Sequence, residues 1–343
     1  MAILAGETLP EIGDKPWHPP ADMRLGAAFF VRGDFPWLGH YFGSQKLASI
    51  LSPGIGGIVS WGGRVPAKAA DGIARFRRLP HWHLEDGFLR SMDLGKSGAI
   101  PLSIIIDDLG LPVDANRASR LERLIEGAGE VGELGSAIRE QIVLNKLSKY
   151  NHLPHRPPRV ERTTKRRILL VDQVVGDVSV GRALGSKASF EKMLADALAS
   201  DAQCLIRTHP DVMAGLRKGY LTDSASPGNA VLLDDAVSVA SILDIVDEVW
   251  TVSSQFGFDA LLRGIPVRCY AAPFYAGWGV TEDYFGVYTK AALAGRRTKR
   301  RTVDQIAAAA LFLYPTYRDP SDWRKIDVFR AIDLIVAQQK AVA

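Results

Sequence analysis

Polar side chains follow four short apolar runs in the second half of the chain, and each run is typical of a buried strand. In chain order these residues are Asp172, Gln173 and Asp177; Arg207 and His209; Ser253, Ser254 and Gln255; Tyr275, Gly277 and Trp278. Carboxylates and histidine can transfer protons or attack electrophiles, and serines at a helix start can hold a phosphate. The pattern therefore predicts an active site where these strands end.

Each of these signals also has a structural interpretation. The sequence SSQ at 253–255 begins a predicted helix, so its hydroxyls either cap backbone N–H groups or stand beside a bound phosphate. His209 is either a structural histidine or a substrate contact, and Asp259 is either a solvated carboxylate or a ribose ligand. The loop at 273–279 either packs on a sugar or base or forms a turn with buried aromatics. The sequence leaves these pairs open.

Two further segments carry charge. The sequence EDGFLR at 85–90 follows a predicted strand and is either a surface turn or places Glu85 opposite Asp177. The dense basic run at 296–301 is either a solvated loop or a contact for an anionic ligand, a membrane surface or an acidic polymer. Two acids, Asp172 at the end of the predicted strand at 168–172 and Asp177 beyond Gly176, are both candidates for chemistry.

Short apolar strands alternate with amphipathic helices along the chain, which predicts an α/β fold with parallel sheets covered on both faces. Strands are predicted at 25–31, 57–61, 81–84, 103–107, 168–172, 203–207, 230–233, 248–252 and 266–270. The first 20 residues predict an irregular lead-in, and the Pro-rich basic segment at 151–167 predicts a linker. We expect two doubly wound domains, at 1–160 and 165–301, that face each other across a cleft, with helices at 302–343 packing back on the first.

Composition narrows the functional class. The chain has 343 residues and a net charge of +4, too small to indicate a nucleic-acid partner. Cys204 and Cys269 lie in apolar runs, as expected of free thiols in a reducing compartment. We see no secretory signal and no apolar stretch that could span a bilayer, which predicts a cytoplasmic protein; peripheral contact with a membrane stays compatible with the sequence. Phosphate-loop, dinucleotide, HExxH, CxxC and Gly-x-Ser-x-Gly patterns are absent, so we expect no metal and no nicotinamide cofactor.

The longer motifs together resemble one family. They are EDGFLRS at 85–91, SKYN at 148–151, VDQ at 171–173 with GD at 176–177, HPD at 209–211, SSQFGFDAL at 253–261, PFYAGWG at 273–279 and RRTKRR at 296–301. In order and spacing, over about residues 57–320, the chain resembles a single module of the KpsC-type capsule polysaccharide proteins, which are retaining β-Kdo glycosyltransferases. The resemblance implies a GT-B-like fold of two Rossmann-type domains, with CMP-Kdo as the donor and no cofactor.

The resemblance also implies roles for individual residues. Asp177, the acid of the Gly-Asp pair, would be the nucleophile of a double displacement through a covalent Asp adduct, and Asp172 would have a structural or orienting role. Retention needs two inversions, so a second group must handle the acceptor proton, and we expect Glu85 to do so. His209 would stabilise or protonate the departing phosphate. The residues expected to bind the donor are Gln173, Arg207, Ser253, Ser254, Gln255, Gly257, Asp259, Tyr275, Gly277 and Trp278. Arg90, Lys149 and Asn151 are candidates for the Kdo carboxylate or the acceptor.

The chain departs from the family pattern at some points. Asp259 stands where the family usually has Glu, many relatives carry two modules, and the segment before residue 57 matches no pattern. The expected acceptor is an oligosaccharide or glycolipid of capsule or surface polysaccharide biosynthesis, with peripheral inner-membrane association compatible. Two alternatives stay open: a GT-B-like transferase for another CMP-activated nonulosonic acid, and a non-catalytic glycan-binding partner of polysaccharide export.

Overall fold

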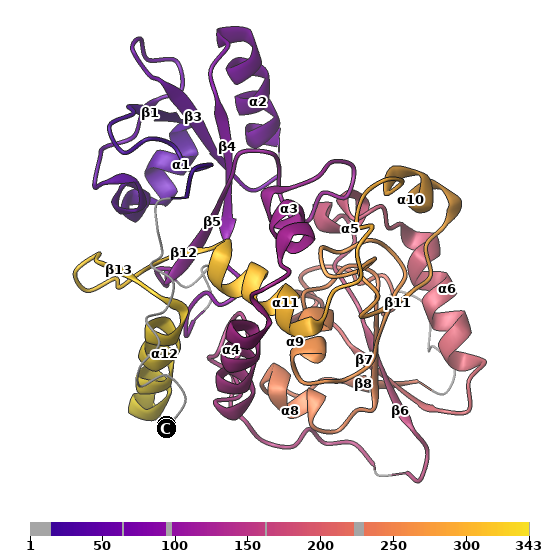
Figure 1. Cartoon of the computed structure of the whole chain (residues 1–343). Helices are drawn as coiled ribbons and strands as arrows, with labels where there is room; N and C mark the ends of the chain where they lie inside the picture. The colour runs from indigo at the N-terminus through magenta and orange to yellow at the C-terminus, as the bar shows by residue number, and fades with distance from the viewer. Residues whose placement is uncertain (1–14, 64, 94–97, 162, 223–229, 343) are drawn as a thin grey trace.

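The computed structural model describes residues 15–63, 65–93, 98–161, 163–222 and 230–342. Within them the chain forms two β-sheets flanked by helices, so the α/β class predicted from the sequence is confirmed (Figure 1). Most of the predicted irregular lead-in lies outside the described residues. No helix in the described part of the chain is long and apolar enough to cross a membrane.

The second sheet lies between Arg167 and Asp283 and is parallel throughout. Its order is β11-β10-β9-β6-β7-β8, so the chain winds outward in one direction from β6 and then in the other from β9. This is the Rossmann order, and ligands of such sheets bind beyond the carboxyl ends of the strands where the order reverses, here between β6 and β9. The strands are β6 (Arg167–Val171), β7 (Gln203–Arg207), β8 (Val231–Leu233), β9 (Glu248–Thr251), β10 (Val267–Cys269) and β11 (Glu282–Asp283).

The first sheet has the order β13-β12-β5-β4-β3-β1-β2, and both ends of the chain contribute to it. Pairing among β2, β1, β3 and β4 is parallel, but β5 pairs antiparallel with β4 and β12. The prediction of a fully parallel sheet is wrong here, because a parallel partner needs a long crossover and the described residues between β4 and β5 form no helix. The strands are β1 (Leu25–Ala27), β2 (Ala48–Ser49), β3 (Gly57–Trp61), β4 (His81–Asp86), β5 (Ser103–Asp107), β12 (Thr316–Arg318) and β13 (Lys325–Ile326).

Helices cover the sheets with apolar faces, and some of them begin at side-chain caps. Ser119 and Ser238 accept hydrogen bonds from backbone N–H groups at the starts of α3 and α8, and Thr302 and Gln305 form a capping box at the start of α11. The helices are α1 (Phe29–Asp34), α2 (Val65–Arg77), α3 (Arg120–Gly127), α4 (Gly132–Leu144), α5 (Val178–Arg182), α6 (Lys187–Leu198), α7 (Pro210–Met213), α8 (Val239–Leu243), α9 (Phe256–Leu262), α10 (Val287–Ala292), α11 (Val303–Ala308) and α12 (Val328–Val342), with a 3-10 helix at Pro36–Phe42 and a π-helical turn at Ala309–Leu313.

One hydrophobic core joins the two halves. It contains Phe88 and Ile138 from the first half, Phe258 and Trp278 from the second, and Tyr314 from the returning segment. Figure 1 shows α11 lying between α4 and α9, and α12 beside α4. The approach of α4 to α11 is close: a Cβ on Gly135 would lie 1.8 Å from the Asp304 carbonyl oxygen. The two helices therefore pack so closely at Gly135 that a larger residue there would clash with the backbone of α11.

The basic run at 296–301 belongs to this junction. Arg296 forms a two-point ion pair with Glu122 of α3, with both N···O distances 2.6 Å, and Arg297 also contacts Glu122 at 3.1 Å. Arg301 donates to the carbonyl oxygens of Ile125 and Glu126 at the C-terminal end of α3, where the helix dipole favours positive charge. Three arginines of the run therefore form contacts within the protein. From the sequence we considered a solvated loop and a contact for an anionic partner, and did not predict this structural role.

Candidate active site

Gln173 connects the two strands at which the second sheet reverses direction. It follows β6, and its side-chain oxygen accepts from the backbone N–H of Ser253, after β9, at 3.1 Å. Its amide nitrogen lies 3.2 Å from the Ser253 hydroxyl and 3.4 Å from that of Ser179. The sequence-predicted residues Gln173 and Ser253 therefore meet at the position where a doubly wound sheet binds its ligand.

Asp172 is buried, and four donors surround its carboxylate. The backbone N–H groups of Gln173 and Leu221 bond Oδ1 at 2.8 and 3.0 Å, and the hydroxyls of Thr208 and Thr222 bond Oδ2 at 3.0 and 3.3 Å. Burial raises the pKa of Asp172, although these hydrogen bonds oppose the shift. The side chain ties the end of β6 to the loop after β7 and to the segment at 219–222, in agreement with the orienting role predicted for it.

Asp177, unlike the buried Asp172, has an exposed side chain. Gly176 has a φ of +81°, which turns the chain sharply after β6, and Asp177 then caps α5 through a 2.9 Å bond from the Ser179 N–H to Oδ1. Within the described part of the chain, Oδ2 has no hydrogen-bond partner. The loop is held from behind, where the Val175 N–H donates to the Lys218 carbonyl at 2.8 Å. A fixed backbone thus presents an open carboxylate oxygen.

Glu85 approaches from the first half, near the end of β4, and is half-buried. The two halves are joined close to Glu85, where Arg182, the last residue of α5, donates to the Gly63 carbonyl at 2.8 Å. The neighbouring Gly62 lies beside Glu85, since a Cβ added to Gly62 would be 3.7 Å from Glu85 Oε2. Asp177 begins the same short helix that Arg182 ends. The contact brings the element that carries Asp177 against the strand ends that carry Glu85.

Lys149 adds a cation to this junction. Desolvation lowers its pKa, but the charges of Tyr150, Asp86 and Glu85 outweigh this effect and raise the pKa overall. Arg90, by contrast, is 3% exposed and already bonds Asp86 Oδ1 at 2.7 Å. Asn151 bonds Ser148 and the Ser91 carbonyl, so its amide holds the loop together. The predicted ligand roles of Arg90 and Asn151 stay predictions.

The SSQFGFDAL segment at 253–261, which contains the start of α9, contacts the EDGFLRS segment at 85–91 of the first half. Gln255 donates to the Phe88 carbonyl at 3.0 Å, and Ser254 Oγ accepts from the Phe256 N–H at 3.2 Å. Asp259 is 6% exposed; desolvation raises its pKa to about 7, against the opposing charges of Arg263 and Lys149. The residues predicted to hold a nucleotide therefore also join the two halves.

His209 and Arg207 diverge at the end of β7. The His209 side chain is 45% exposed, and its Nδ1 accepts from the Asp211 N–H at 3.1 Å. The Arg207 guanidinium donates to the Asp235 carbonyl at 2.8 Å, in the loop after β8, and burial lowers its pKa. The His209 side chain is thus partly exposed, whereas the Arg207 guanidinium holds the sheet edge.

The aromatic loop forms a buried turn. Tyr275 and Trp278 are 0% and 1% exposed; the Tyr275 hydroxyl donates to the Ser254 carbonyl at 2.5 Å, and the Trp278 indole donates to the Phe274 carbonyl at 2.8 Å. Gly257 provides the space, because a Cβ there would lie 2.3 Å from the Tyr275 oxygen, and Gly277 turns the loop with a φ of +85°. The rings support the start of α9 from below and offer no surface to a ligand here, so their direct donor contact stays a prediction.

Sequence reasoning missed several residues that shape the site. Arg182 fastens α5 to the first half, Ser179 contacts both Gln173 and Asp177, and Gly219 lies where a Cβ would meet Asp172 Oδ2 at 2.1 Å. The capping position of Ser179 two residues after Asp177 was a usable signal. No local pattern pointed to Arg182 or Gly219, because their partners are 119 and 47 positions away.

The fold and the site define a class of protein: two α/β units with a Rossmann-type sheet and polar strand ends at their junction, the architecture of GT-B glycosyltransferases. The family follows from the comparison with known sequences. The model of the capsule polysaccharide biosynthesis protein family matches residues 57–158 and 133–317, and the chain belongs to this family.

Curated relatives come from two bacteria. The capsule polysaccharide modification protein LipA of Neisseria meningitidis serogroup B is 36% identical over 292 residues, which are 82% of this chain and 41% of LipA. The lipopolysaccharide-processing protein LpsZ of Rhizobium meliloti is 32% identical over 98% of this chain and 77% of LpsZ. The chain thus spans about two-fifths of the length of LipA.

Two solved structures share the fold over nearly their whole length. The Thermosulfurimonas dismutans KpsC beta Kdo 2,4 transferase has a TM-score of 0.82 and 33% identity, covering 92% of this chain and 98% of that one. The KpsC beta Kdo 2,7 transferase of the same organism has a TM-score of 0.68 and 25% identity, covering 92% and 99%. The GT-B-like fold that the resemblance implied is therefore confirmed.

Proposed function

We propose that this chain is a retaining β-Kdo glycosyltransferase that moves Kdo from CMP-Kdo to a glycan or glycolipid acceptor in capsule or surface polysaccharide biosynthesis. One observation carries the proposal. In a chain that matches a beta Kdo 2,4 transferase with a TM-score of 0.82, Asp177 presents an exposed carboxylate at the switch point of the Rossmann sheet. A fixed, open carboxylate is what a covalent glycosyl intermediate requires.

The chemistry has two displacement steps. In the first, Asp177 Oδ2 forms a bond to the anomeric carbon while the bond from that carbon to the CMP phosphate oxygen breaks, and the electron pair leaves with CMP. His209, which is exposed at the end of β7, stabilises or protonates the departing phosphate. In the second, the acceptor oxygen attacks the same carbon, Glu85 takes its proton, and the carboxylate of Asp177 leaves. Two inversions retain the configuration.

The donor would lie between the switch point and α9. Gln173, Ser253 and Ser254 form the polar wall of this region, and Gln255 and Asp259 stand where α9 meets the first half. Asp259 with a pKa of about 7 is protonated part of the time at neutral pH, so it can donate to a ribose hydroxyl as well as accept from one. Arg207 and Lys149 are both cations that could pair with the Kdo carboxylate. Lys149 fits better, because Arg207 already donates to the Asp235 carbonyl.

Asp177→Asn tests the proposal. The variant keeps size and exposure and removes the nucleophile, so transfer from CMP-Kdo generated in situ should fall at least about 10³-fold. CMP binding, measured as thermal stabilisation by CMP against UDP and GDP, should be unchanged. Asp201→Asn changes a carboxylate of the same half that is 88% exposed, so it is the matched control and should keep full transfer.

Other outcomes separate the alternatives. Full transfer by Asp177→Asn excludes Asp177 as the nucleophile. Stabilisation by UDP alone contradicts a CMP-sugar donor, while CMP stabilisation with transfer of a different nonulosonic acid identifies another sugar in the same fold. Glycan binding without transfer by the wild-type protein would assign a binding role to the chain.

A further inference from the structure

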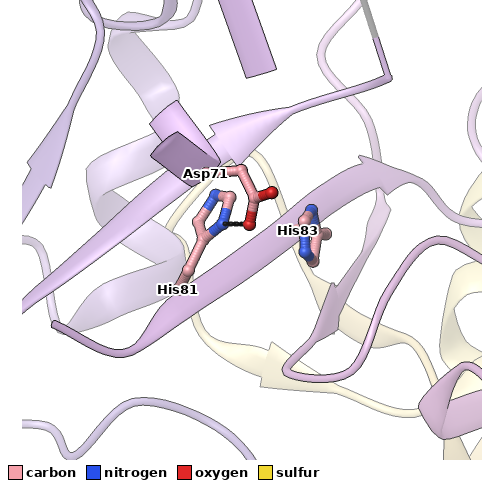
Figure 2. Close-up of side chains that lie close together, drawn as sticks. All are labelled: Asp71, His81 and His83. Carbon is pink, nitrogen blue, oxygen red and sulfur yellow. Dashed lines mark ion pairs between the residues drawn. The ribbon is translucent and has the colours of Figure 1, made fainter. Parts of the chain in front are cut away.

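Two histidines on β4 face away from the core of the first sheet. Trp82 and Leu84 pack into the core, and because side chains alternate along a strand, His81 and His83 point to the opposite face. Asp71 of α2 lies across from them (Figure 2). Asp71 precedes His81 by ten positions in the sequence, and the motifs of the sequence include none of the three residues.

The distances fit a single metal ion. One potential ligand atom from each of the three side chains lies within 4.8 Å of the other two. His81 Nδ1 and Asp71 Oδ1 are 3.5 Å apart, and the two imidazole rings have centroids 4.3 Å apart at 51°. Ligands about 2.0–2.1 Å from a tetrahedral Zn²⁺ are separated by about 3.3 Å, so the His81–Asp71 separation already matches one edge of such a site.

The surroundings of His81 support a ligand site independently of the distances. Its side chain is 8% exposed, and Nδ1 is buried and has no hydrogen-bond partner among the described residues, although it faces the carboxylate of Asp71. Nε2 is 2.8 Å from the Ser60 hydroxyl, which orients the ring as the outer partner of a metal-ligating histidine does. His81 Nδ1 and Asp71 Oδ1 therefore face each other across 3.5 Å, a gap that a cation bound to both atoms would bridge.

The neighbouring arginines and the chemistry of the three ligands limit which cation can bind. Arg75 pairs with Asp71, and Arg117 Nη2 is 3.2 Å from His83 Nε2. Ligation through His83 Nδ1 would put the proton on Nε2 and cost the hydrogen bond to Arg117, about 1 kcal/mol. Two imidazoles with one carboxylate select a divalent transition ion over Mg²⁺ or Ca²⁺, which take oxygen ligands.

We propose that Asp71, His81 and His83 form a site for a divalent transition-metal ion, best matched by Zn²⁺ with a water as fourth ligand. The ion would fasten α2 to β4, the strand that carries Glu85 two residues beyond His83. Its role is structural, and it does not depend on the proposed transferase activity.

The test uses untagged, metal-free full-length protein. Calorimetric titration with ZnCl₂ should give one equivalent bound with micromolar or tighter affinity, and Co²⁺ should develop the visible absorption bands of a four-coordinate site. Affinity should fall at least about tenfold in Asp71→Asn, His81→Ala and His83→Ala, and by a similar factor in Ser60→Ala, because loss of an outer partner alone costs 10–100-fold. Zn²⁺ should raise the melting temperature of the wild type and not of these variants.

His155→Ala is the matched control, since His155 Nε2 also lies 3.5 Å from a carboxylate, that of Asp244, but without a second histidine. Its Zn²⁺ affinity should equal that of the wild type. The proposal is overturned if the wild type binds no Zn²⁺ below millimolar concentration, or if binding persists in all three ligand variants. Asp71→Asn changes a partly exposed helix position, so it keeps the test valid if a buried histidine variant fails to fold.

Discussion

The carboxyl edge of the second sheet and the junction between the two halves contribute to the proposed site in different ways. At the edge, Asp172, Gln173 and Asp177 lie within six residues of the end of β6, and the strand itself positions them. At the junction, contacts join residues far apart in the chain, such as Gln255 with Phe88 and Arg296 with Glu122. The difference indicates that a short segment can supply a reactive group, whereas the groups that face it depend on the packing of the whole chain.

The largest stability effect is expected at the junction. Glu122→Gln removes the charge that two buried or half-buried arginines share, and breaking such a pair typically costs about 3 kcal/mol or more. Urea unfolding should show this loss, while Glu126→Gln, on the same helix, should cost less than about 1 kcal/mol. Equal values for the two variants would show that the junction does not depend on this pair.

Glu122 should also make the stability of the protein depend on pH. Burial raises the pKa of Glu122, but the hydrogen bond from Arg296 and the charges of Arg297 and Arg296 outweigh it and lower the pKa below its usual value. A lowered folded-state pKa contributes stability above the unfolded-state pKa, and this contribution is lost as the pH falls through the folded-state value. The advantage of the wild type over Glu122→Gln should therefore shrink in acid.

The two acids at the edge should differ in how much their substitution lowers the unfolding free energy. Asp172→Asn replaces an acceptor by a donor among four donors, which should cost about 2 kcal/mol of unfolding free energy. Asp177→Asn changes an exposed helix cap, where Asn is as good as Asp, and should cost less than about 0.5 kcal/mol. Chemical denaturation checks both. A larger loss in Asp177→Asn would reverse the assignment of orienting and reactive roles.

The sequence predicted the edge better than the junction for a physical reason. An apolar run followed by polar residues is a local pattern, and it located five of the six strands of the second sheet and the two acids Asp172 and Asp177; the two-residue strand β11 was missed. The antiparallel pairing of β5, the docking of Arg296 on Glu122 and the convergence of Asp71 with His81 depend on contacts between distant segments. Burial of Tyr275 was left open because an aromatic residue in a glycine-rich loop packs equally well on a ligand or on the protein.

Asp259 lies where the edge of the second sheet meets the junction between the two halves, and it should make the unfolding free energy depend on pH. Its folded-state pKa of about 7 is raised, so the stabilising contribution of the protonated form is lost as the pH rises toward 7. Relative to Asp259→Asn, the wild type should lose about 1.4 kcal/mol per pH unit between pH 5 and pH 7. Urea unfolding of both proteins across this range measures the difference. A constant difference would show that Asp259 is ionised throughout.

The smallest effect is expected at Ser253. Ser253→Ala removes one hydroxyl contact of Gln173, whose amide still reaches Ser179, so the sheet edge should keep its shape. Loss of one hydrogen bond, about 1 kcal/mol, should weaken CMP-Kdo binding about fivefold and change kcat less than twofold. Steady-state kinetics gives both values. A fall in kcat alone would place Ser253 in the chemical step.

The central claim is that Asp177 forms a bond to the sugar. Intact-protein mass spectrometry after incubation with CMP-Kdo generated in situ, without acceptor, tests it most directly. We expect a mass increase of one Kdo residue, located by peptide mapping to Asp177, absent in Asp177→Asn and discharged when acceptor is added. Transfer that proceeds with no adduct on the wild type, or an adduct that persists in Asp177→Asn, would contradict the account.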